Sequence, residues 1–449
     1  MPVATNDFKQ LKVAVVGGGL GGMAAAIALR RAGHLGALRS LITPFVLTDG
    51  WIVSIYERRD FKVEVGASIS CAANGGKWLR EWGVDVSKGR PTNLQQLTMR
   101  DWHSGEILNQ YSLEDYEANW GLPYYMFYRM EMHEMLMNVA ISPEGQGPPA
   151  TVVVDHIATD VDCEAGIITF ASGEQVHADL IIGADGIRSA VRNLLGNVPQ
   201  TKSANQTCYR CNVSREDIHK LGLMADANDP AIQFWGGYNK GDLSQYYKIV
   251  MSPCSEGDIV SFYCFMPTEM TNHTAEGFVF AQVPVEEMLA GKYDQLDPKC
   301  RALLENSVER KPWRLYVHQP YSSWYKGKAC ILGDAAHPMM PHQSQGACMA
   351  IEDAGALGVI FSNKYNFTTD VEAGLEFYEQ IRKPRATRVQ AASVRATENI
   401  NERIGFSSLS AHDQALAAAE GKLTVNEMNE YDMHAHIKSE AATWTKSTA

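Results

Sequence analysis

The chain has 449 residues, of which 45% are hydrophobic and 20% are charged, and this ordinary globular composition excludes a fibrous or disordered protein. One hydrophobic core rarely serves more than about 250–300 residues, so we expect two or three lobes. The formal net charge of −12, without a lysine-rich run, argues against nucleic acid as a partner.

The nine cysteines are scattered and odd in number, which fits no disulfide framework and indicates a reducing compartment. The start MPVATNDFKQ is too polar for a signal segment, no stretch approaches the roughly 18 uninterrupted apolar residues of a membrane span, and the final STA is not a peroxisomal tripeptide. We therefore expect a cytoplasmic protein that binds no membrane. Cys208 and Cys211 have CxxC spacing without a second pair, and HPMMPH lacks HExxH spacing, so we expect no metal site.

The first predicted elements are a strand, a tight turn and a helix, in LKVAVVGGGLGGMAAAIALRRAGH at residues 11–34. Gly17, Gly19 and Gly22 form GxGxxG at the turn. The first glycine permits the turn, the second lets the backbone approach a pyrophosphate, and the third lets helix and strand pack closely, while the helix N-terminus offers N–H donors to phosphates. The pattern predicts a dinucleotide site but does not distinguish FAD from NAD.

The next strand, VSIYERRD at residues 53–60, carries Glu57, a candidate acceptor for ribose hydroxyls. Glu57 follows Gly22 by 35 residues, whereas such an acid is expected about 20 residues on. Removing the 17 residues from Gly36 to Ile52 would leave a spacing of 18. This segment is therefore an anomalous insertion with two open explanations, a retained intron that has been translated or a genuine surface loop, for which its apolar content is unusual.

The middle of the chain is rich in strand patterns. Residues 150–189 hold short strands separated by turns and predict a small meander that leads back to the first domain. From about residue 207 to 280, apolar and polar residues alternate, as in QYYKIVMS, which predicts antiparallel strands with one face available to a ligand. The strand, glycine turn and helix order then resumes, and after Phe377 the pattern is charged and helical.

Two later segments bear on the choice of cofactor. DLIIGADGIRSAVR, residues 179–192, resembles the DG motif of the flavoprotein aromatic hydroxylases, and ACILGDAAHPMMPHQSQGACMAIEDAGAL, residues 329–357, resembles their GD motif. With GGGLGG, these motifs occur in the order typical of the class A FAD-dependent aromatic monooxygenases of the salicylate and p-hydroxybenzoate hydroxylase type, and the chain is similar to their fungal members over nearly its whole length.

The resemblance implies an α/β fold, in which a discontinuous Rossmann-like FAD-binding domain is interrupted by an antiparallel-sheet substrate domain and followed by a helical C-terminal region. The expected division is FAD-binding domain at 1–85, 129–200 and 316–370, a connecting or substrate-lobe segment at 86–128, substrate domain at 201–315, and C-terminal helices at 371–449.

The resemblance also implies that the cofactor is FAD, with NAD(P)H and O2 as co-substrates. Asp334 follows an apolar strand and a glycine, so its carboxylate can take a ribose hydroxyl, and Arg129 matches the family's arginine at the start of a helix that reaches FAD. Asp185 and Arg188 could form a charge-assisted pair beside the cofactor, whereas for His337 we favour packing over catalysis. The FAD-contact candidates are Gly17, Gly19, Gly22, Glu57, Gly66, Ala67, Arg129, Asp185, Gly333, Asp334, Gly346 and Ala347.

The implied reaction is hydroxylation of a small phenolic acid through a flavin hydroperoxide, with or without decarboxylation. Ionising a phenol of pKa near ~10 calls for a positive or hydrogen-bonding neighbour. Arg210 has the planar fork that binds a carboxylate or phenolate, and one of Tyr246 and Tyr247 should point inward because side chains alternate along a strand. These three residues are the catalytic candidates, and Tyr238 and His318 are held in reserve.

Two alternatives stay open at the level of the sequence. The glycine turn alone would serve an NAD-dependent dehydrogenase equally well, and a flavin-binding protein without turnover, or a mis-spliced product, would share every motif. The sequence also leaves open NADH or NADPH, the exact substrate, and whether the protein is a monomer or a homodimer.

Overall fold

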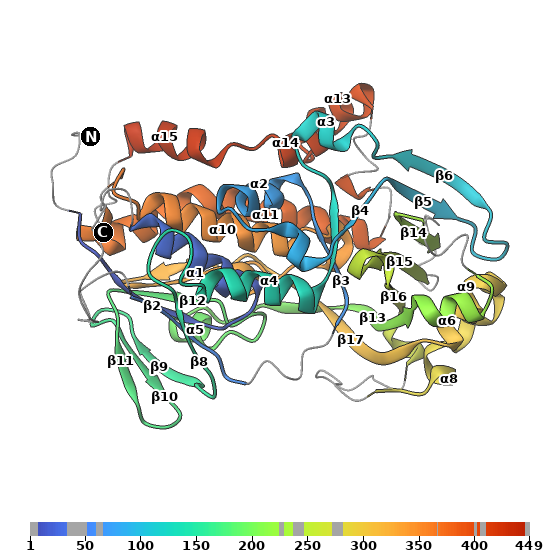
Figure 1. Cartoon of the computed structure of the whole chain (residues 1–449), viewed down its shortest axis with the longest axis horizontal. Helices are drawn as coiled ribbons and strands as arrows, with labels where there is room; N and C mark the ends of the chain where they lie inside the picture. Colours follow the sequence, from blue (N-terminus) through green and yellow to red (C-terminus); the bar gives the residue numbers. More distant parts are fainter. Residues whose placement is uncertain are drawn as a thin grey trace.

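The computed structural model describes residues 8–33, 52–59, 66–223, 229–236, 247–271, 282–365, 367–398, 402–404 and 410–444. At one end lies a six-stranded sheet in the order β18-β19-β12-β1-β2-β8, parallel except for the β18–β19 pair (Figure 1). Its strands are β1 (Lys12–Val16), β2 (Ile52–Tyr56), β8 (Thr151–Val153), β12 (Leu180–Gly183), β18 (Tyr325–Lys326) and β19 (Ala329–Ile331). The central strands β1 and β12 are apolar and buried apart from Lys12 at the start of β1, because a parallel sheet is covered on both faces.

A layer of helices packs on this sheet. It comprises α1 (Leu20–Ala32), α2 (Ala73–Glu81), α4 (Arg129–Ile141), α10 (Gly346–Ile360) and α11 (Val371–Glu398). Helix α1 lies on β1 and β2, α11 lies on β18 and β19, and α10 lies between α1 and α11. The run of alanines in α1 is buried on all sides, and this lets the helices approach closely: a Cβ on Gly358 of α10 would lie 2.9 Å from the Cβ of Ala28.

The predicted meander is confirmed. Strands β9 (Ala158–Asp162), β10 (Ile167–Phe170) and β11 (Gln175–His177) form an antiparallel sheet in the order β11-β10-β9, and the chain then enters β12. The meander packs on β2 through Tyr56 and Phe170, whose ring centroids are 4.9 Å apart.

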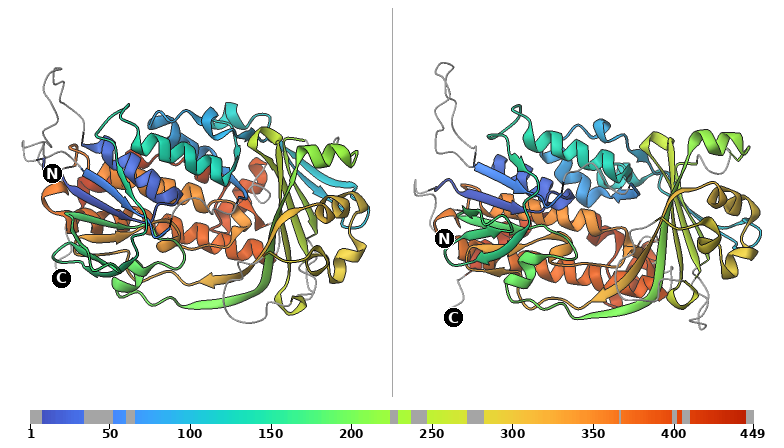
Figure 2. Two further views of the ribbon diagram at one scale, coloured as in Figure 1. Left: turned by 60° about the horizontal axis from the view of Figure 1, so that its bottom comes forward. Right: turned by 90° about the horizontal axis from the view of Figure 1, so that it is seen from below.

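At the other end of the molecule lies a seven-stranded sheet in the order β17-β13-β16-β15-β14-β5-β6 (Figure 2). All neighbours are antiparallel except β14 and β5. The strands are β5 (Gln96–Arg100), β6 (Ile107–Ser112), β13 (Thr201–Ser214), β14 (Ala231–Gly236), β15 (Lys248–Cys254), β16 (Ile259–Pro267) and β17 (Val308–His318). One face packs on a separate core beneath α6 (Arg215–Lys220), α8 (Val285–Met288) and α9 (Pro298–Glu305), which leaves the other face toward the first sheet.

Shorter elements complete the fold. A small sheet of β3 (Ser68–Cys71), β7 (Tyr125–Tyr128) and β4 (Thr92–Asn93) lies between the two large sheets, next to β15 and β16. The C-terminal helices α13 (Ala411–Ala419), α14 (Val425–Asn429) and α15 (Met433–Thr443) lie along the outside of the helical layer (Figure 1). The remaining helices and turns are α3 (Tyr116–Trp120), α5 (Ala190–Leu194), η2 (Val86–Gly89), η4 (Ser255–Gly257), η5 (Thr268–Met270), η6 (Gly291–Gln295), η7 (Gly333–Ala335), η8 (Pro341–Gln343) and η9 (Phe367–Thr369).

The predicted α/β fold with a parallel sheet, antiparallel sheets and a helical C-terminal region is therefore confirmed. The anomalous segment Gly36 to Ile52 lies outside the described residues apart from Ile52, where β2 begins in parallel register with Lys12. Within the described residues, no helix is long and apolar enough to cross a membrane.

Candidate functional site

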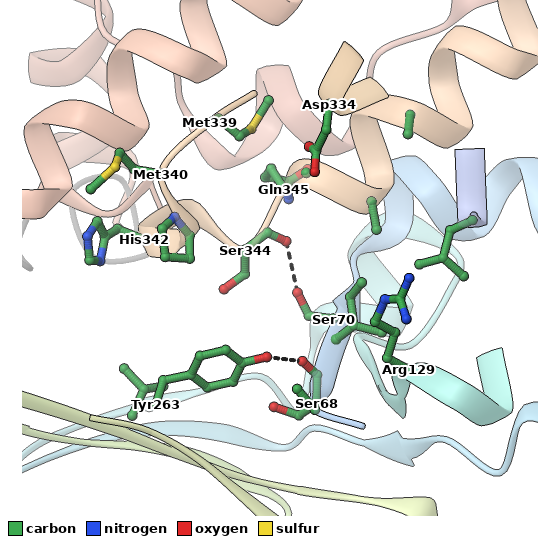
Figure 3. Close-up of a pocket in the computed structure, with 18 of the residues that line it drawn as sticks. Ser68, Ser70, Arg129, Tyr263, Asp334, Met339, Met340, His342, Ser344 and Gln345 are labelled. Atoms are coloured by element: carbon green, nitrogen blue, oxygen red, sulfur yellow. Dashed lines mark hydrogen bonds between the residues drawn. The ribbon is translucent and has the colours of Figure 1, made fainter. Parts of the chain in front are cut away.

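A cavity of about 400 Å³ lies where the carboxyl ends of β1, β12 and β19 meet the inner face of the seven-stranded sheet (Figure 3). Such a crevice at the carboxyl ends of parallel strands is the usual ligand site of an open α/β sheet. Among the FAD-contact candidates, the cavity wall includes Gly19, Ala67, Arg129, Gly333, Asp334, Gly346 and Ala347. Arg210 lines it from the side of the seven-stranded sheet.

The glycine turn joins β1 to α1 with no room for side chains. Gly17 has φ +107°, and its N–H donates to the carbonyl oxygen of Tyr56 at 2.8 Å. A Cβ on Gly22 would lie 2.0 Å from the carbonyl oxygen of Gly17, so only glycine allows α1 to begin here. Gly19, by contrast, has open space where its Cβ would be, and it caps α1 at the cavity wall. The helix N-terminus therefore offers its N–H groups to an anion in the cavity.

Glu57 reaches this turn in spite of its distance along the chain. Its Oε2 accepts a hydrogen bond from the N–H of Gly18 at 2.8 Å. His133 of α4 contacts the same residue, with Nε2 2.6 Å from the carbonyl oxygen of Gly18. The acid thus lies beside the glycine turn, as the fingerprint requires.

Arg129 is the first residue of α4, and its N–H donates to the carbonyl oxygen of Ala67 at 2.9 Å. Both residues line the cavity, and Figure 3 shows the side chain of Arg129 in its wall. Gly66 lies behind this wall. A Cβ on Gly66 would overlap the hydroxyl of Tyr128, so glycine lets the chain pass beneath that ring.

The DG motif contributes a helix cap rather than a cavity side chain. The carboxylate of Asp185 accepts from Ser189 Oγ at 2.5 Å and from the N–H groups of Ala190 and Val191 at 2.7 and 3.2 Å, at the start of α5. Burial raises the pKa of Asp185, and these hydrogen bonds oppose the rise. The pair with Arg188 that the sequence suggested is not among these contacts.

The GD motif forms a tight turn whose acid faces the cavity. Gly333 has φ +58°, and the carboxylate of Asp334 points into the cavity opposite Tyr263 and Ser68 (Figure 3). Enclosure by protein raises the pKa of Asp334, and nearby His337, Arg129 and Arg210 oppose the rise. The next residues along the wall, Gly346 and Ala347, open α10, so a second helix N-terminus lies at the same cavity.

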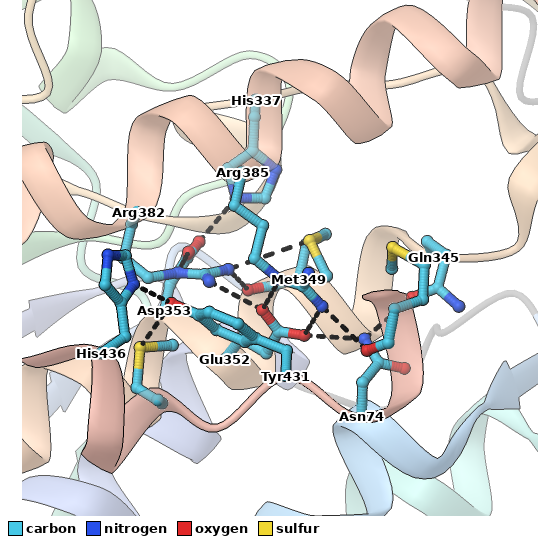
Figure 4. A network of polar contacts seen from close by, with 12 residues as sticks. Asn74, His337, Gln345, Met349, Glu352, Asp353, Arg382, Arg385, Tyr431 and His436 are labelled. Atoms are coloured by element: carbon cyan, nitrogen blue, oxygen red, sulfur yellow. Dashed lines mark hydrogen bonds and ion pairs between the residues drawn. The ribbon is translucent and has the colours of Figure 1, made fainter. Parts of the chain in front are cut away.

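A buried polar network holds the GD turn in place (Figure 4). Asp353 of α10 accepts from the N–H of Gly333 at 3.0 Å and lies 2.6 Å from Nε2 of His337. Arg382 of α11 binds Asp353 at 2.8 Å and Glu352 at 2.7 Å. His337 is therefore part of the support behind the turn and does not line the cavity.

The far end of the cavity is lined by cations. Arg210 of β13 lies between two aromatic rings, with its guanidinium carbon 5.3 Å from the centroid of Tyr263 and 4.7 Å from that of Trp313. Its Nε is buried and has no hydrogen-bond partner among the described residues. Lys248 and Arg403 line the same end. Neither residue is among the candidates from the sequence, although the alternation in QYYKIVMS places Lys248 on the other face of the strand from Tyr247.

The structure shows which face of that strand lines the cavity, a choice that the sequence left open. Tyr247 is buried in the core of the seven-stranded sheet, with its ring centroid 6.1 Å from Trp102 and 5.6 Å from Tyr293, and it does not line the cavity. Lys248 faces the cavity instead, because successive side chains alternate. The candidates Tyr238 and Tyr246 lie outside the described residues.

Two further candidates are not part of the cavity. His318 is buried against the hydroxyl of Tyr321 at 3.1 Å from Nδ1, and burial lowers its pKa to about 4. Cys208 and Cys211 are buried free thiols, like the other cysteines, and the described residues contain no cluster of side chains suited to a metal ion.

The comparisons with known proteins agree with this geometry. A family described as "FAD binding domain" matches residues 10–393. Hispidin-3-hydroxylase of Neonothopanus nambi is 31% identical over 400 residues, which cover 85% of this chain and 87% of that protein. The FAD-dependent monooxygenase cfoG of Aspergillus candidus is 32% identical over 397 residues, 85% of this chain and 84% of that protein. The chain belongs to the FAD-dependent monooxygenases.

A solved structure described as a salicylate hydroxylase substrate complex shares the fold, with a TM-score of 0.70 and 21% identity over 96% of this chain and 97% of that one. Family membership decides against the NAD-dependent dehydrogenase: the protein is a flavin-dependent monooxygenase that binds FAD, and NAD(P)H is the reductant typical of this class. The cavity fits this cofactor, since two helix N-termini, Arg129 and the open space at Gly19 suit a pyrophosphate.

Proposed function

We propose that the protein hydroxylates a small phenolic acid, using NAD(P)H and O2, and that the substrate binds at the cationic end of the cavity. The observation that supports this proposal most directly is the charge of the wall: Arg210 and Arg403 are cations that line the cavity, and Lys248, which also lines it, becomes one when it takes up a proton. An anionic carboxylate or phenolate would neutralise them. The names of the related hispidin-3-hydroxylase and of the salicylate hydroxylase structure agree with an aromatic substrate.

We propose that FAD is held by the twelve residues named from the sequence, in two ways. Gly19, Ala67, Arg129, Asp334 and Ala347 would contact it from the wall, whereas the other candidates would shape the turns that carry these contacts. FAD reduced by NAD(P)H supplies the activation of dioxygen, which is chemistry that the protein side chains lack.

The work left to the chain is to position, desolvate and ionise the substrate. Arg210 is held rigidly between Tyr263 and Trp313, so its donors are preorganised for a planar anion. Phe234 and Phe265 add apolar surface on which an aromatic ring can pack. We propose that the substrate loses its carboxyl group when the hydroxylated carbon is the one that bears this group. When another carbon is hydroxylated, the carboxyl group stays.

The experiment is a turnover assay on the purified holoenzyme with salicylate, orsellinate and 6-hydroxynicotinate. We expect a flavin absorption band, faster NADH or NADPH oxidation with at least one phenol, and a product that has gained one oxygen atom, while CO2 release separates the decarboxylating course from simple hydroxylation. A flavin-loaded enzyme whose reductant oxidation no phenol stimulates would contradict the proposal.

A further inference from the structure

Lys248 is an unusual lysine because it lies inside the protein. It is the first residue of β15, its side chain lines the cavity, and its exposed fraction is 5%. Its Nζ lies 2.8 Å from Nδ1 of His342 in η8 and 4.7 Å from the ring centroid of Phe265. Buried lysines are normally paired with an acid, so the partners of this one need an explanation.

Among the described residues, the groups that surround Lys248 include a base and a cation but no carboxylate. Within the described part of the chain, no carboxylate forms an ion pair with it. The titratable and charged groups that face it are His342 from η8, Cys208 from β13 and Arg403 from residues 402–404. An ammonium ion at this position therefore has no counter-ion among the described residues, and Arg403 adds a like charge.

Protonation follows from this environment. Burial lowers the pKa of Lys248 to about 7, with a smaller lowering by Arg403, while Cys208 opposes it. Burial together with Lys248 keeps the pKa of His342 well below its usual value. Both side chains can thus be uncharged at neutral pH. Lys248 can then take up a proton when an anion binds beside it.

His342 fixes the direction of the amine. Its Nδ1 faces Lys248, so a neutral imidazole accepts one N–H of the amine there and carries its own proton on Nε2. The imidazole ring packs on Phe265, with centroids 4.9 Å apart. Its Nε2 is buried and has no hydrogen-bond partner among the described residues, so a polar group of a ligand would satisfy it.

We propose that Lys248 accepts the proton of the phenolic hydroxyl of the substrate and that His342 is its positioning residue, an inference that rests on the proposed function. The O–H bond of the phenol breaks, a new N–H bond forms on Nζ, and the electron pair of the broken bond stays on the phenolate oxygen. The phenolate then supplies the counter-ion that Lys248 lacks, and its electron density activates the ring. The proton returns to solvent or to the product when the product leaves, so no further reactant is needed.

The test compares wild type with Lys248→Met and Lys248→Arg, each as the FAD-loaded enzyme. Methionine keeps the length of the side chain without a basic nitrogen, and arginine keeps the positive charge but does not accept a proton near neutral pH. Lys202→Met is the matched control, because Lys202 is an exposed lysine of β13, in the same sheet, that does not line the cavity. A flavin spectrum and a thermal unfolding curve show that each variant is folded and loaded with FAD.

The kinetic result distinguishes a base from a simple positive charge. For wild type, kcat/KM should rise with pH and level off with an inflection near 7, since the neutral amine is the active form. Both Lys248 variants should lose roughly 100-fold or more in kcat/KM at neutral pH and should lose that inflection. Lys248→Arg with wild-type activity and pH profile would overturn the proposal in favour of charge alone.

A binding measurement does not depend on turnover. With 4-nitrophenol as the probe, at a pH where the free probe is protonated, wild type should show the absorption band of the bound phenolate, whereas Lys248→Met should show bound phenol. An enzyme that hydroxylates phenols but binds the probe as phenol would overturn the role of Lys248 alone. A wild type that gives the phenolate band without hydroxylating any phenol would contradict the proposed function while supporting the base.

The role of His342 has its own readout. His342→Asn retains a side-chain oxygen that can accept from Nζ, whereas His342→Phe does not. If His342 positions the amine, the inflection in kcat/KM should stay near its wild-type pH in the asparagine variant and shift in the phenylalanine variant. Equal profiles for the two variants would remove His342 from the proposal.

Discussion

At the scale of single residues, the substrate end of the cavity depends on cations that the packing makes rigid. Of the two catalytic candidates that the structure describes, Arg210 lines the cavity and Tyr247 does not, and Arg210 lies between two rings that come from other strands. Strand register explains this: Tyr263 of β16 lies directly across from Arg210, and Trp313 of β17 lies across from Cys208, two positions along the strand. Such neighbours come from long-range pairing, and no local pattern in the sequence reveals them.

We expect Arg210→Lys to weaken substrate binding. Lysine loses the planar fork and the stacking on both rings, and a hydrogen bond to a charged group contributes about 1.5–3 kcal/mol, so kcat/KM should fall roughly 10- to 100-fold. Most of the loss should be in KM, and the flavin spectrum should not change. Arg314→Lys is the control, since Arg314 also stacks on a ring, Tyr316 at 5.6 Å, but does not line the cavity. Equal effects of the two substitutions would argue against a substrate contact at Arg210.

At the scale of elements, the parts that could be predicted are those whose chemistry is local. The β1–α1 glycine turn needs glycine because the backbone closes on itself within six residues, so the sequence carries the whole signal. The network behind the GD turn is different. Glu352 and Asp353 of α10 and Arg382 of α11 look like surface charges in the sequence. They are buried because α10 and α11 pack together and bring Glu352 and Arg382, 30 residues apart, into contact.

The two glycines of the turn should respond differently to alanine. A Cβ on Gly22 would meet the carbonyl oxygen of Gly17 at 2.0 Å, so Gly22→Ala should cost about 1–3 kcal/mol of stability even without FAD. Gly19→Ala places a methyl group in open space at the cavity wall, so the apoprotein should keep its stability within about 0.5 kcal/mol while FAD affinity falls. Urea unfolding of the apoproteins and flavin fluorescence titration measure the two effects. Loss of apoprotein stability in Gly19→Ala would contradict this division.

Removing one acid of the buried network should destabilise the packing of α10 on α11. Asp353→Asn leaves His337 and Arg382 without a charged partner at that position, and breaking a buried pair costs about 3–5 kcal/mol. Glu305→Gln, which breaks the exposed pair with Arg301, should cost less than about 1 kcal/mol. Thermal unfolding of the two variants measures the difference, and equal melting temperatures would show that the network contributes little.

The carboxylate of Asp353 should make the stability of the protein fall in acid. Burial alone would raise the pKa of Asp353, but His337 and Arg382 outweigh burial and lower it to about 2. The unfolded carboxyl has a pKa near ~3.9, so its contribution to stability is full above that pH and is lost as pH falls toward about 2. In unfolding experiments, wild type should therefore lose more stability than Asp353→Asn between about pH 4 and pH 2. Parallel curves for the two proteins would contradict the assignment.

At the scale of the whole molecule, the cavity lies between the two large sheets and takes walls from both. The glycine turn, the GD turn and α10 belong to the six-stranded sheet and its helices, whereas Arg210 and Lys248 belong to the seven-stranded sheet. The fold class and the motif order could be predicted because each motif is contiguous. The approach of Lys248, His342 and Arg403 could not, since it depends on how β15, η8 and residues 402–404 meet in space.

This arrangement predicts that FAD stabilises both halves of the molecule together. A ligand that binds only the folded protein adds about 2.7 kcal/mol when its free concentration is 100 times the dissociation constant. Because the walls come from both large sheets, the holoenzyme should melt several degrees above the apoprotein, in one transition that near-UV circular dichroism and flavin release report at the same temperature. Arg129→Ala removes a side chain of the cavity wall at the start of α4. It should therefore reduce the rise in melting temperature that FAD causes, without lowering the melting temperature of the apoprotein by a comparable amount. Two transitions, of which FAD raises only one, would show that the cofactor is held by one half alone.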